Sequence, residues 1–171
     1  MKGCPTIFQK QIWKKNIQYK KRIRLKNYDY TGYNCYFITI CTRDKKHALK
    51  DAGLIAWLAD ILKEKAESFS FRIWAYCFML DHLHLLIEGK AINSDMKKFI
   101  SSYKQVTGFY YKKKTGHDLW QINYYEHVLR EEEDTKDVAH YIWNNPVRKG
   151  LVDDFRRYDG NGSFEFDIKQ M

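Results

Sequence analysis

The sequence predicts a single α+β domain in which helices cover one face of an antiparallel sheet. Two kinds of segment alternate along the chain: short runs rich in β-branched and aromatic residues, and longer runs whose apolar residues recur at helical spacing. Their order is strand, helix, strand, strand, helix, strand, helix, which is typical of a ferredoxin-like sandwich. The length of 171 residues suits one hydrophobic core. We expect the other face of the sheet to be free to receive a ligand.

The first half of the chain contains three predicted strands and one helix. Residues 34–42 are mostly β-branched and aromatic, which predicts a strand buried on both faces. Apolar residues spaced three and four apart predict an amphipathic helix over residues 54–68. Residues 71–79 and 83–88 form the next two strands, and the residues between them indicate a tight turn or a bulge.

The second half contains a long helix, a strand and a final helix that carries a tyrosine. Ser94 is a suitable N-cap for the long helix, and Gly116 is a suitable stop. Residues 124–130 predict the fourth strand. The final helix begins near residues 132–135 and ends at the Asn145–Pro146 junction, because a proline ring disfavours helical conformation in the residue before it.

Positive charge is concentrated near the N-terminus. Residues 1–50 contain 13 basic and two acidic side chains, whereas the net charge of the whole chain is +9. Tryptophan and tyrosine residues are interleaved with these cations, a combination that favours a polyanion with stackable bases, namely nucleic acid. The alternative is a solvated basic arm without a partner. The basic side chains that we expect to contact DNA are Lys20, Lys21, Arg22, Arg24, Arg43, Lys97, Lys104, Lys112 and Lys113.

The composition also bears on the cellular compartment. The four cysteines, Cys4, Cys35, Cys41 and Cys77, show no CxxC spacing, which indicates reduced thiols rather than a disulfide framework. The sequence contains no apolar run long enough for a membrane span and no apolar N-terminal stretch. We therefore expect a soluble, cytoplasmic protein that has no membrane partner.

Two histidines flank one leucine in the strand-like run of residues 79–87. Side chains at positions i and i+2 of a strand point to the same face, so His82 and His84 stand side by side while Leu83 enters the opposite layer. Such a pair can bind a divalent metal ion. The alternative is a pair of core histidines whose hydrogen bonds are satisfied.

Three polar residues share one face of the final helix. Asp137, Tyr141 and Asn145 are spaced four residues apart, so they line up along the helix. If this helix packs beside the histidine strand, Tyr141 presents its hydroxyl near the metal and Asn145 supplies an oxygen ligand. Two imidazoles, one amide oxygen and open positions suit a catalytic ion better than a structural one. Otherwise Tyr141 is a packed aromatic residue and Asn145 caps the helix end.

These side chains fit an attack on a phosphodiester. A metal ion polarises a non-bridging oxygen and offsets the negative charge of the phosphate. A tyrosine, whose ordinary pKa is about 10, attacks when a cation or a proton-accepting base lies beside it. The phosphotyrosine ester keeps the energy of the broken bond, so a free 3′-hydroxyl can reverse the step and join strands without a nucleotide cofactor.

Five segments in order carry a resemblance to a known family, and they occupy residues 36–43, 76–86, 119–121, 124–130 and 141–152. Together they resemble the single-tyrosine HUH transposases of insertion sequences, most closely their REP-associated branch. The resemblance implies that His82 and His84 bind Mg²⁺ or Mn²⁺, that Tyr141 is the nucleophile and that Asn145 is the third metal ligand. It also implies cleavage of single-stranded DNA, often beside a hairpin, with a 5′-phosphotyrosine link and a free 3′-hydroxyl.

The resemblance divides the chain into a basic arm over residues 1–32, a transposase domain over 33–152 and a tail over 153–171. The tail has few apolar anchors, so we expect it to be loose. The sequence departs from the family at Leu80-Asp81, where proline and asparagine are usual. Relatives with this motif work as monomers or as homodimers, and both states are compatible with the sequence.

Two other functions stay open. The protein could be a non-catalytic binder of hairpin or single-stranded DNA, with a vestigial metal site. It could also be a structural zinc module in which Cys77 joins the two histidines, although Cys77 belongs to the preceding strand.

Overall fold

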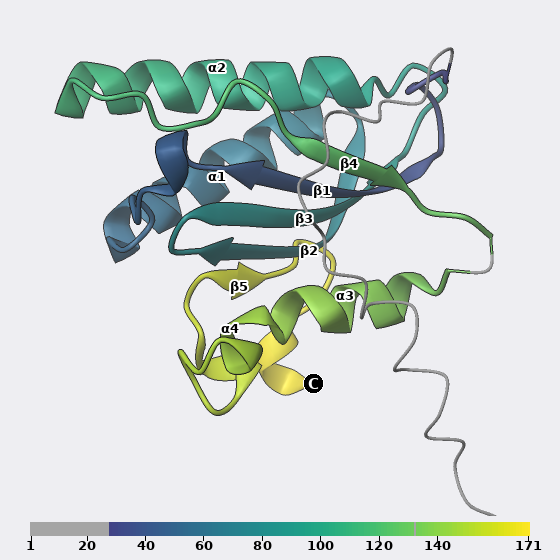
Figure 1. Cartoon of the computed structure of the whole chain (residues 1–171). Helices are drawn as coiled ribbons and strands as arrows, with labels where there is room; N and C mark the ends of the chain where they lie inside the picture. Colours follow the sequence, from purple (N-terminus) through teal and green to yellow (C-terminus); the bar gives the residue numbers. More distant parts are fainter. Residues whose placement is uncertain (1–27, 132) are drawn as a thin grey trace, which may run out of the picture.

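The structure, a computed structural model, describes residues 28–131 and 133–171, and these residues form a five-stranded antiparallel sheet with helices on both faces (Figure 1). The strands are β1 (Cys35–Cys41), β2 (Phe71–Met79), β3 (His82–Gly89), β4 (Tyr125–Val128) and β5 (Asn161–Gly162). The α-helices are α1 (Ala52–Ser68), α2 (Met96–Thr115), α3 (Thr135–Trp143) and α4 (Asn145–Arg148). Short 3-10 helices are η2 (Arg43–Lys45), η3 (Phe155–Arg157) and η4 (Ile168–Gln170).

The sheet has the strand order β4-β1-β3-β2-β5, and each pair of neighbours is antiparallel. The first four strands with α1 and α2 have the βαββαβ connectivity of a ferredoxin-like fold, so the predicted fold class is confirmed. A two-residue turn, Leu80 and Asp81, joins β2 to β3 and sets Met79 opposite His82. The histidine run therefore begins directly at a tight turn.

One face of the sheet packs on α1 and α2. The inward side chains of β1 and β3 on this face are apolar or aromatic and fully buried; they are Tyr36, Ile38, Ile40, Leu83, Leu85 and Ile87. The helices contribute Leu58, Leu62, Phe99, Ile100 and Tyr103 to the same cluster. Burying each aliphatic side chain stabilises the fold by about 1.5–3 kcal/mol, so this layer supplies most of the hydrophobic stabilisation.

The opposite face of the sheet is covered in part by α3. Phe37 of β1 and Leu86 of β3 pack against one apolar side of this helix, which consists of Val138, Ala139, Ile142 and Trp143. Figure 1 shows α3 and α4 on the far side of the sheet from α2. The expectation that this face is free was therefore wrong for the part under α3, because an amphipathic helix must bury its apolar side.

The C-terminal segment is packed, so the expectation of a loose tail was also wrong. Strand β5 pairs with β2, and Ile168 is buried in the same cluster as α3. The indole nitrogen of Trp143 donates a hydrogen bond to the carbonyl of Gly162 (3.0 Å). The amide nitrogen of Asn161 donates to the carbonyls of Trp143 (2.9 Å) and Phe155 (3.0 Å). These bonds hold the segment without an apolar repeat in its sequence.

Two helix ends differ from the prediction. Asp95 rather than Ser94 caps α2, since its carboxylate accepts a hydrogen bond from the backbone nitrogen of Lys98 (3.0 Å). The Ser94 hydroxyl instead donates to the carbonyl of Ser70 (2.7 Å). Helix α3 ends at Trp143, two residues early, and the chain continues as α4 with its proline in the first turn. Gly116 ends α2 in the left-handed conformation, with φ of 77°, as predicted.

Within the described residues, no helix combines the length and the apolar character that a membrane crossing requires. Cys35, Cys41 and Cys77 are free thiols.

Candidate active site

Strand β3 places both histidines on the sheet face that carries α3. His82 and His84 alternate with Leu83 and Leu85, which belong to the core on the other face. The Nε2 atoms of the two histidines are 3.0 Å apart, and their rings meet edge to face with centroids 4.5 Å apart. The predicted side-by-side pair is therefore present.

The Nδ1 atom of each histidine has a polar partner. Asp81 Oδ1 lies 2.5 Å from Nδ1 of His82, and because a carboxylate accepts, this nitrogen carries the proton. Thr39 Oγ1 lies 2.9 Å from Nδ1 of His84, which it faces in the register of β1 with β3. Metal-binding histidines are held by such partners on the nitrogen remote from the metal. With the Nδ1 proton of His84 donated to Thr39 Oγ1, the Nε2 atoms of both histidines have a lone pair for a metal ion.

The Nε2 pair fits two adjacent ligands of one divalent ion. Nitrogen ligands about 2.1 Å from an ion and at right angles to each other are about 3.0 Å apart. The separation of the Nε2 atoms, 3.0 Å, agrees with this value. In the described part of the chain, three or more His, Cys, Asp or Glu side chains do not cluster into a metal site. Further ligands would therefore be amide, water or substrate oxygens.

Burial keeps both imidazoles neutral near neutral pH. It lowers the pKa of His84 well below the ordinary value, and repulsion from a protonated His82 and from Arg148 lowers it further. Burial also lowers the pKa of His82, against the opposing effect of Asp81. Neutral imidazole is the form that binds metal ions, so the pair is ready to accept a cation.

Cys77 does not behave as a zinc ligand. It lies opposite His84 in the register of β2 with β3, but it packs in the apolar cluster under α3. Burial raises the pKa of its thiol, whereas zinc binds the thiolate. This environment is that of a core thiol and does not support the zinc-module hypothesis.

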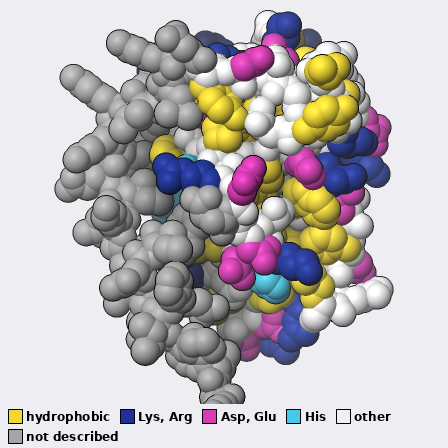
Figure 2. Space-filling model, turned by 90° about the vertical axis from the view of Figure 1, so that its right-hand side faces the viewer, with side chains coloured by type: hydrophobic (Ala, Val, Ile, Leu, Met, Phe, Trp, Pro, Cys, Tyr) yellow, Lys and Arg dark blue, Asp and Glu magenta, His cyan; other side chains and the backbone are white. Residues whose placement is uncertain are grey.

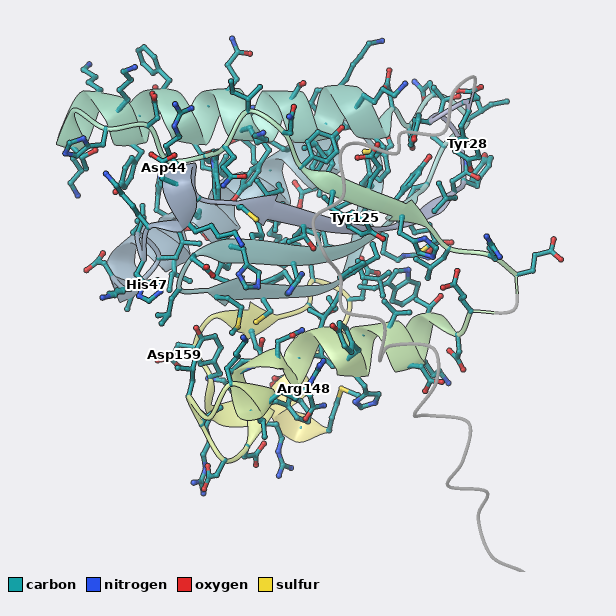
Figure 3. All side chains as sticks on the ribbon, viewed as in Figure 1. Tyr28, Asp44, His47, Tyr125, Arg148 and Asp159 are labelled. Carbon is teal, nitrogen blue, oxygen red and sulfur yellow. The ribbon has the colours of Figure 1, made fainter. Side chains whose placement is uncertain are left out.

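Tyr141 lies on the same side of the sheet as the histidines. The ring of Phe37 stacks on His84 with centroids 5.4 Å apart, and it meets the ring of Tyr141 edge to face at 6.3 Å. The guanidinium carbon of Arg148, labelled in Figure 3 at α4, lies 4.7 Å from the centroid of the Tyr141 ring. The structure thus brings His84 and Tyr141 onto one phenylalanine, and Arg148 lies over the tyrosine ring.

Asn145 follows Tyr141 by four residues, although the break at Asn144 separates α3 from α4. Its amide nitrogen donates to the carbonyls of Tyr141 (3.0 Å) and Ile142 (3.1 Å). This amide therefore caps the end of α3, which was the alternative interpretation. Because the nitrogen is used, the amide oxygen is the atom of Asn145 that is available as a ligand.

The basic residues predicted to contact DNA do not form one surface. Lys20, Lys21, Arg22 and Arg24 lie outside the described residues. Lys97 and Lys112 both belong to α2, but their separation of 15 positions corresponds to about 22 Å along a helix. On the described part of the face in Figure 2, basic and acidic side chains are interspersed.

Most of the described cations in this set have local partners. The ammonium group of Lys104 donates to the carbonyls of Gln121 (2.7 Å) and Ile122 (2.8 Å) and so holds the segment before β4. The other contacts are Lys112 with Asp118 (2.9 Å), Arg43 with Asp44 (3.6 Å) and Lys97 over the ring of Tyr30 (4.3 Å). Lys113 is exposed.

The family of the chain follows from a comparison with protein-family models. A model described as "Transposase IS200 like" matches residues 31–145, which is more than half of the chain. The chain belongs to the IS200-like transposase family. The matched region of this transposase includes both histidines, Tyr141 and Asn145.

Relatives of this IS200-like transposase have more specific names. A protein of Haemophilus influenzae, provisionally named a REP-associated tyrosine transposase, is 28% identical over 154 residues, which cover 82% of this chain and 85% of the relative. The REP-associated tyrosine transposase of Escherichia coli is 25% identical over 122 residues, or 68% of each chain. A solved structure of a REP-associated tyrosine transposase bound to a REP hairpin shares the fold, with a TM-score of 0.69, 20% identity, and coverage of 88% of this chain and 87% of the other.

Three residues around the site of this IS200-like transposase were not singled out from the sequence. Phe37 and Thr39 are two residues apart in a strand, so their side chains point to the same face. The sequence pattern does not reveal which strand pairs with the histidine strand, or in which register. Arg148 lies in a segment of family resemblance, yet the short turn that directs it back to Tyr141 has no apolar signature.

Proposed function

We propose that this protein is a metal-dependent DNA transesterase that cleaves and rejoins single-stranded DNA near hairpins, with Tyr141 as the nucleophile. The observation that carries the proposal is the contact of both His84 and Tyr141 with the ring of Phe37. Membership of the IS200-like transposase family supports the same chemistry. A relative of the same fold has been solved with a REP hairpin, which supports hairpin DNA as the partner.

In the proposed step the phenolic oxygen of Tyr141 forms a bond to phosphorus, and the bond from phosphorus to O3′ breaks. The phenolic proton leaves to solvent, and the departing O3′ takes up a proton to become a 3′-hydroxyl. One phosphodiester replaces another, so the reverse attack by a 3′-hydroxyl rejoins DNA without an energy source.

His82, His84 and Asn145 would hold Mg²⁺ or Mn²⁺, which supplies Lewis-acid polarisation of a phosphate oxygen when it is bound. Asp81 and Thr39 orient the imidazoles through their Nδ1 atoms. The chain's own contribution is thus to keep two neutral, aligned nitrogen donors beside the tyrosine.

The catalytic unit of this proposal is one chain. Helix α3 reaches the histidine strand of its own chain through Val138, Ile142 and Trp143. The site therefore needs no tyrosine helix from a second copy, which supports a monomer as the active form. Sedimentation of the protein bound to a hairpin oligonucleotide tests this, and activity confined to a dimer would contradict it.

The N-terminal residues supply the electrostatic attraction to DNA in this proposal. Residues 1–27 contain nine basic and no acidic side chains, so the remainder of the chain has a net charge of zero. Removing one cation that binds a phosphate reduces the slope of log affinity against log salt by about 0.7–0.9. We expect deletion of residues 1–27 to weaken hairpin binding and flatten this slope, and an unchanged slope would remove these residues from the interaction.

The deciding experiment incubates the protein with hairpin oligonucleotides and Mn²⁺ and looks for a covalent adduct on a denaturing gel. We expect Tyr141→Phe to lower adduct formation by about 10³-fold or more, because it removes the nucleophile. Tyr125→Phe is the matched control: Tyr125 is 41% exposed and also contacts Phe37, at 6.4 Å between centroids. An adduct that persists in Tyr141→Phe contradicts the proposal, and tight binding by the unmodified protein without an adduct favours a non-catalytic hairpin binder.

A further inference from the structure

Helix α4 holds an arginine against the proposed nucleophile. The guanidinium carbon of Arg148 lies 4.7 Å from the centroid of the Tyr141 ring, which is within the range of a cation–π contact. The same ring touches Phe37, and Phe37 stacks on His84. Arg148 is therefore connected to the histidine pair through two aromatic rings.

The side chain of Arg148 has no acidic partner among the described residues. Four other described arginines do have one, in the pairs Arg43–Asp44, Arg72–Glu88, Arg156–Asp154 and Arg157–Asp153. Arg148 is also exposed, so its N–H groups are accessible to a ligand. An exposed guanidinium without a carboxylate is suited to bind an anion from solution.

Positive charge from other segments gathers at the same place. Lys149, the next residue along the chain, and Lys45 of η2 both lie close enough to lower the pKa of His82, after the larger effect of burial. The carboxylate of Asp81 is bonded to His82 on the strand side of the same pair. Lysines from two other segments thus add positive charge beside the histidine pair.

The planar shape of the guanidinium determines what it binds here. The guanidinium carbon of Arg148 lies over the Tyr141 ring, and the planar group carries its N–H donors in a fork. Such a fork binds two oxygens of one phosphate, and an ammonium group cannot do this while stacked. The arrangement fits a phosphodiester placed next to the phenol.

We infer that Arg148 binds the non-bridging oxygens of the scissile phosphate while its guanidinium stacks on Tyr141, and that it thereby positions the phosphorus atom for attack. This inference rests on the proposed function, because it takes the phosphodiester cleaved by Tyr141 as the ligand. It assigns a substrate-binding residue to α4, a four-residue helix with no apolar pattern of its own.

The first measurement is the rate of adduct formation under single-turnover conditions with Mn²⁺. We expect Arg148→Ala to lower this rate by about 10²-fold. Removing one side chain that stabilises the charge on a reacting group typically costs an enzyme that much. Arg130→Ala is the matched control, because Arg130 is also exposed and its guanidinium forms no ion pair within the described structure, whereas the arginine over the Tyr141 ring is Arg148. The bond from Arg130 to Glu133 uses the backbone nitrogen, which alanine keeps. A rate for Arg148→Ala equal to that of the control overturns the inference.

The second measurement separates a phosphate contact from a structural effect and does not need cleavage. In the Tyr141→Phe background, hairpin oligonucleotides are compared that carry either an ordinary phosphodiester or an uncharged methylphosphonate at the cleavage position. We expect Arg148→Ala to weaken binding of the ordinary oligonucleotide about tenfold and to leave binding of the methylphosphonate within about twofold.

Equal losses on both oligonucleotides, or no loss on either, overturn the inference. If the unmodified protein forms no adduct at all, the proposed function fails and the inference fails with it. If the adduct forms but the two binding losses are equal, only the inference fails.

Discussion

Strand β3 presents leucine and isoleucine to one layer of the molecule and histidine to the other. On the α1 and α2 side, Leu83 and Leu85 are fully buried among aliphatic and aromatic side chains. On the α3 side, His82 and His84 have polar partners and neighbours that come from strand β1 and from the turn before β3. The two faces differ because the first needs only apolar contact, whereas the second needs particular atoms at particular distances. Mutations on the first face should therefore change stability, and mutations on the second should change chemistry.

The largest expected effect comes from the histidine face. We expect His82→Ala or His84→Ala to lower adduct formation by about 10³-fold or more, because each removes a metal ligand. Hairpin affinity should stay within a few fold, since phosphate contacts dominate binding. Gel-based adduct assays and binding titrations measure the two quantities. Normal cleavage by both variants would show that the metal assignment is wrong.

The neighbouring residue on the core face should give the opposite result. We expect Leu85→Ala to lower the free energy of unfolding by about 2–5 kcal/mol, because the substitution removes buried apolar surface and leaves a cavity. Urea denaturation measures this change, and Leu85→Met is the volume-conserving control, with a cost below about 1.5 kcal/mol. The folded fraction of Leu85→Ala should form adduct at the unmodified rate. If folded Leu85→Ala formed the adduct more slowly than the unmodified protein, the core face of β3 would also affect the chemistry, and the two faces would not be distinct in this way.

A smaller effect is expected for a residue that acts through a histidine. Thr39→Val replaces the hydroxyl beside Nδ1 of His84 with a methyl group of similar size. We expect Mn²⁺ affinity to fall about 10–100-fold, as for other partners of metal-binding histidines. Electron paramagnetic resonance titration with Mn²⁺ measures it, and Thr39→Ser, which keeps the hydroxyl, is the control. Equal affinities for valine and serine variants would mean that this hydrogen bond does not orient the ligand.

The smallest effect concerns stability against pH in the metal-free protein. The pKa of His84 is lowered by burial in the folded state, whereas in the unfolded chain it is about 6.5. Below that pH the unfolded chain binds more protons, so the free energy of unfolding should fall as the pH decreases from 6.5. Denaturation at several pH values measures this decline, which should be shallower in His84→Asn. Identical pH profiles for the two proteins would contradict a neutral, buried His84.

The fold was largely predictable because its main elements have strong local patterns. The bounds of β2 follow from its aromatic and apolar content, and the end of α2 at Gly116 follows from a glycine stop. The N-cap of α2 was misplaced by one residue because Ser94 and Asp95 are both good caps, and only tertiary contact with Ser70 determines which one is used. Local sequence contains no information about that contact.

The site was predictable only in part. The histidine pair is visible because its spacing matches the strand period, whereas the partners Thr39 and Phe37 depend on the register of β1 with β3. Lys104 was predicted to contact DNA from its charge alone, but its ammonium group bonds two backbone carbonyls. From the sequence alone, a lysine that stabilises the fold cannot be distinguished from a lysine that binds a ligand.

The bonds from Trp143 to Gly162 and from Asn161 to Trp143 have a genetic consequence. A nonsense mutation just before codon 161 would spare the codons of both histidines and of Tyr141, yet it would remove the bonds that brace the end of α3. A motif search would still score such a truncated allele as intact. The encoded protein, however, would lack the contacts that fix α3 beside the histidine strand.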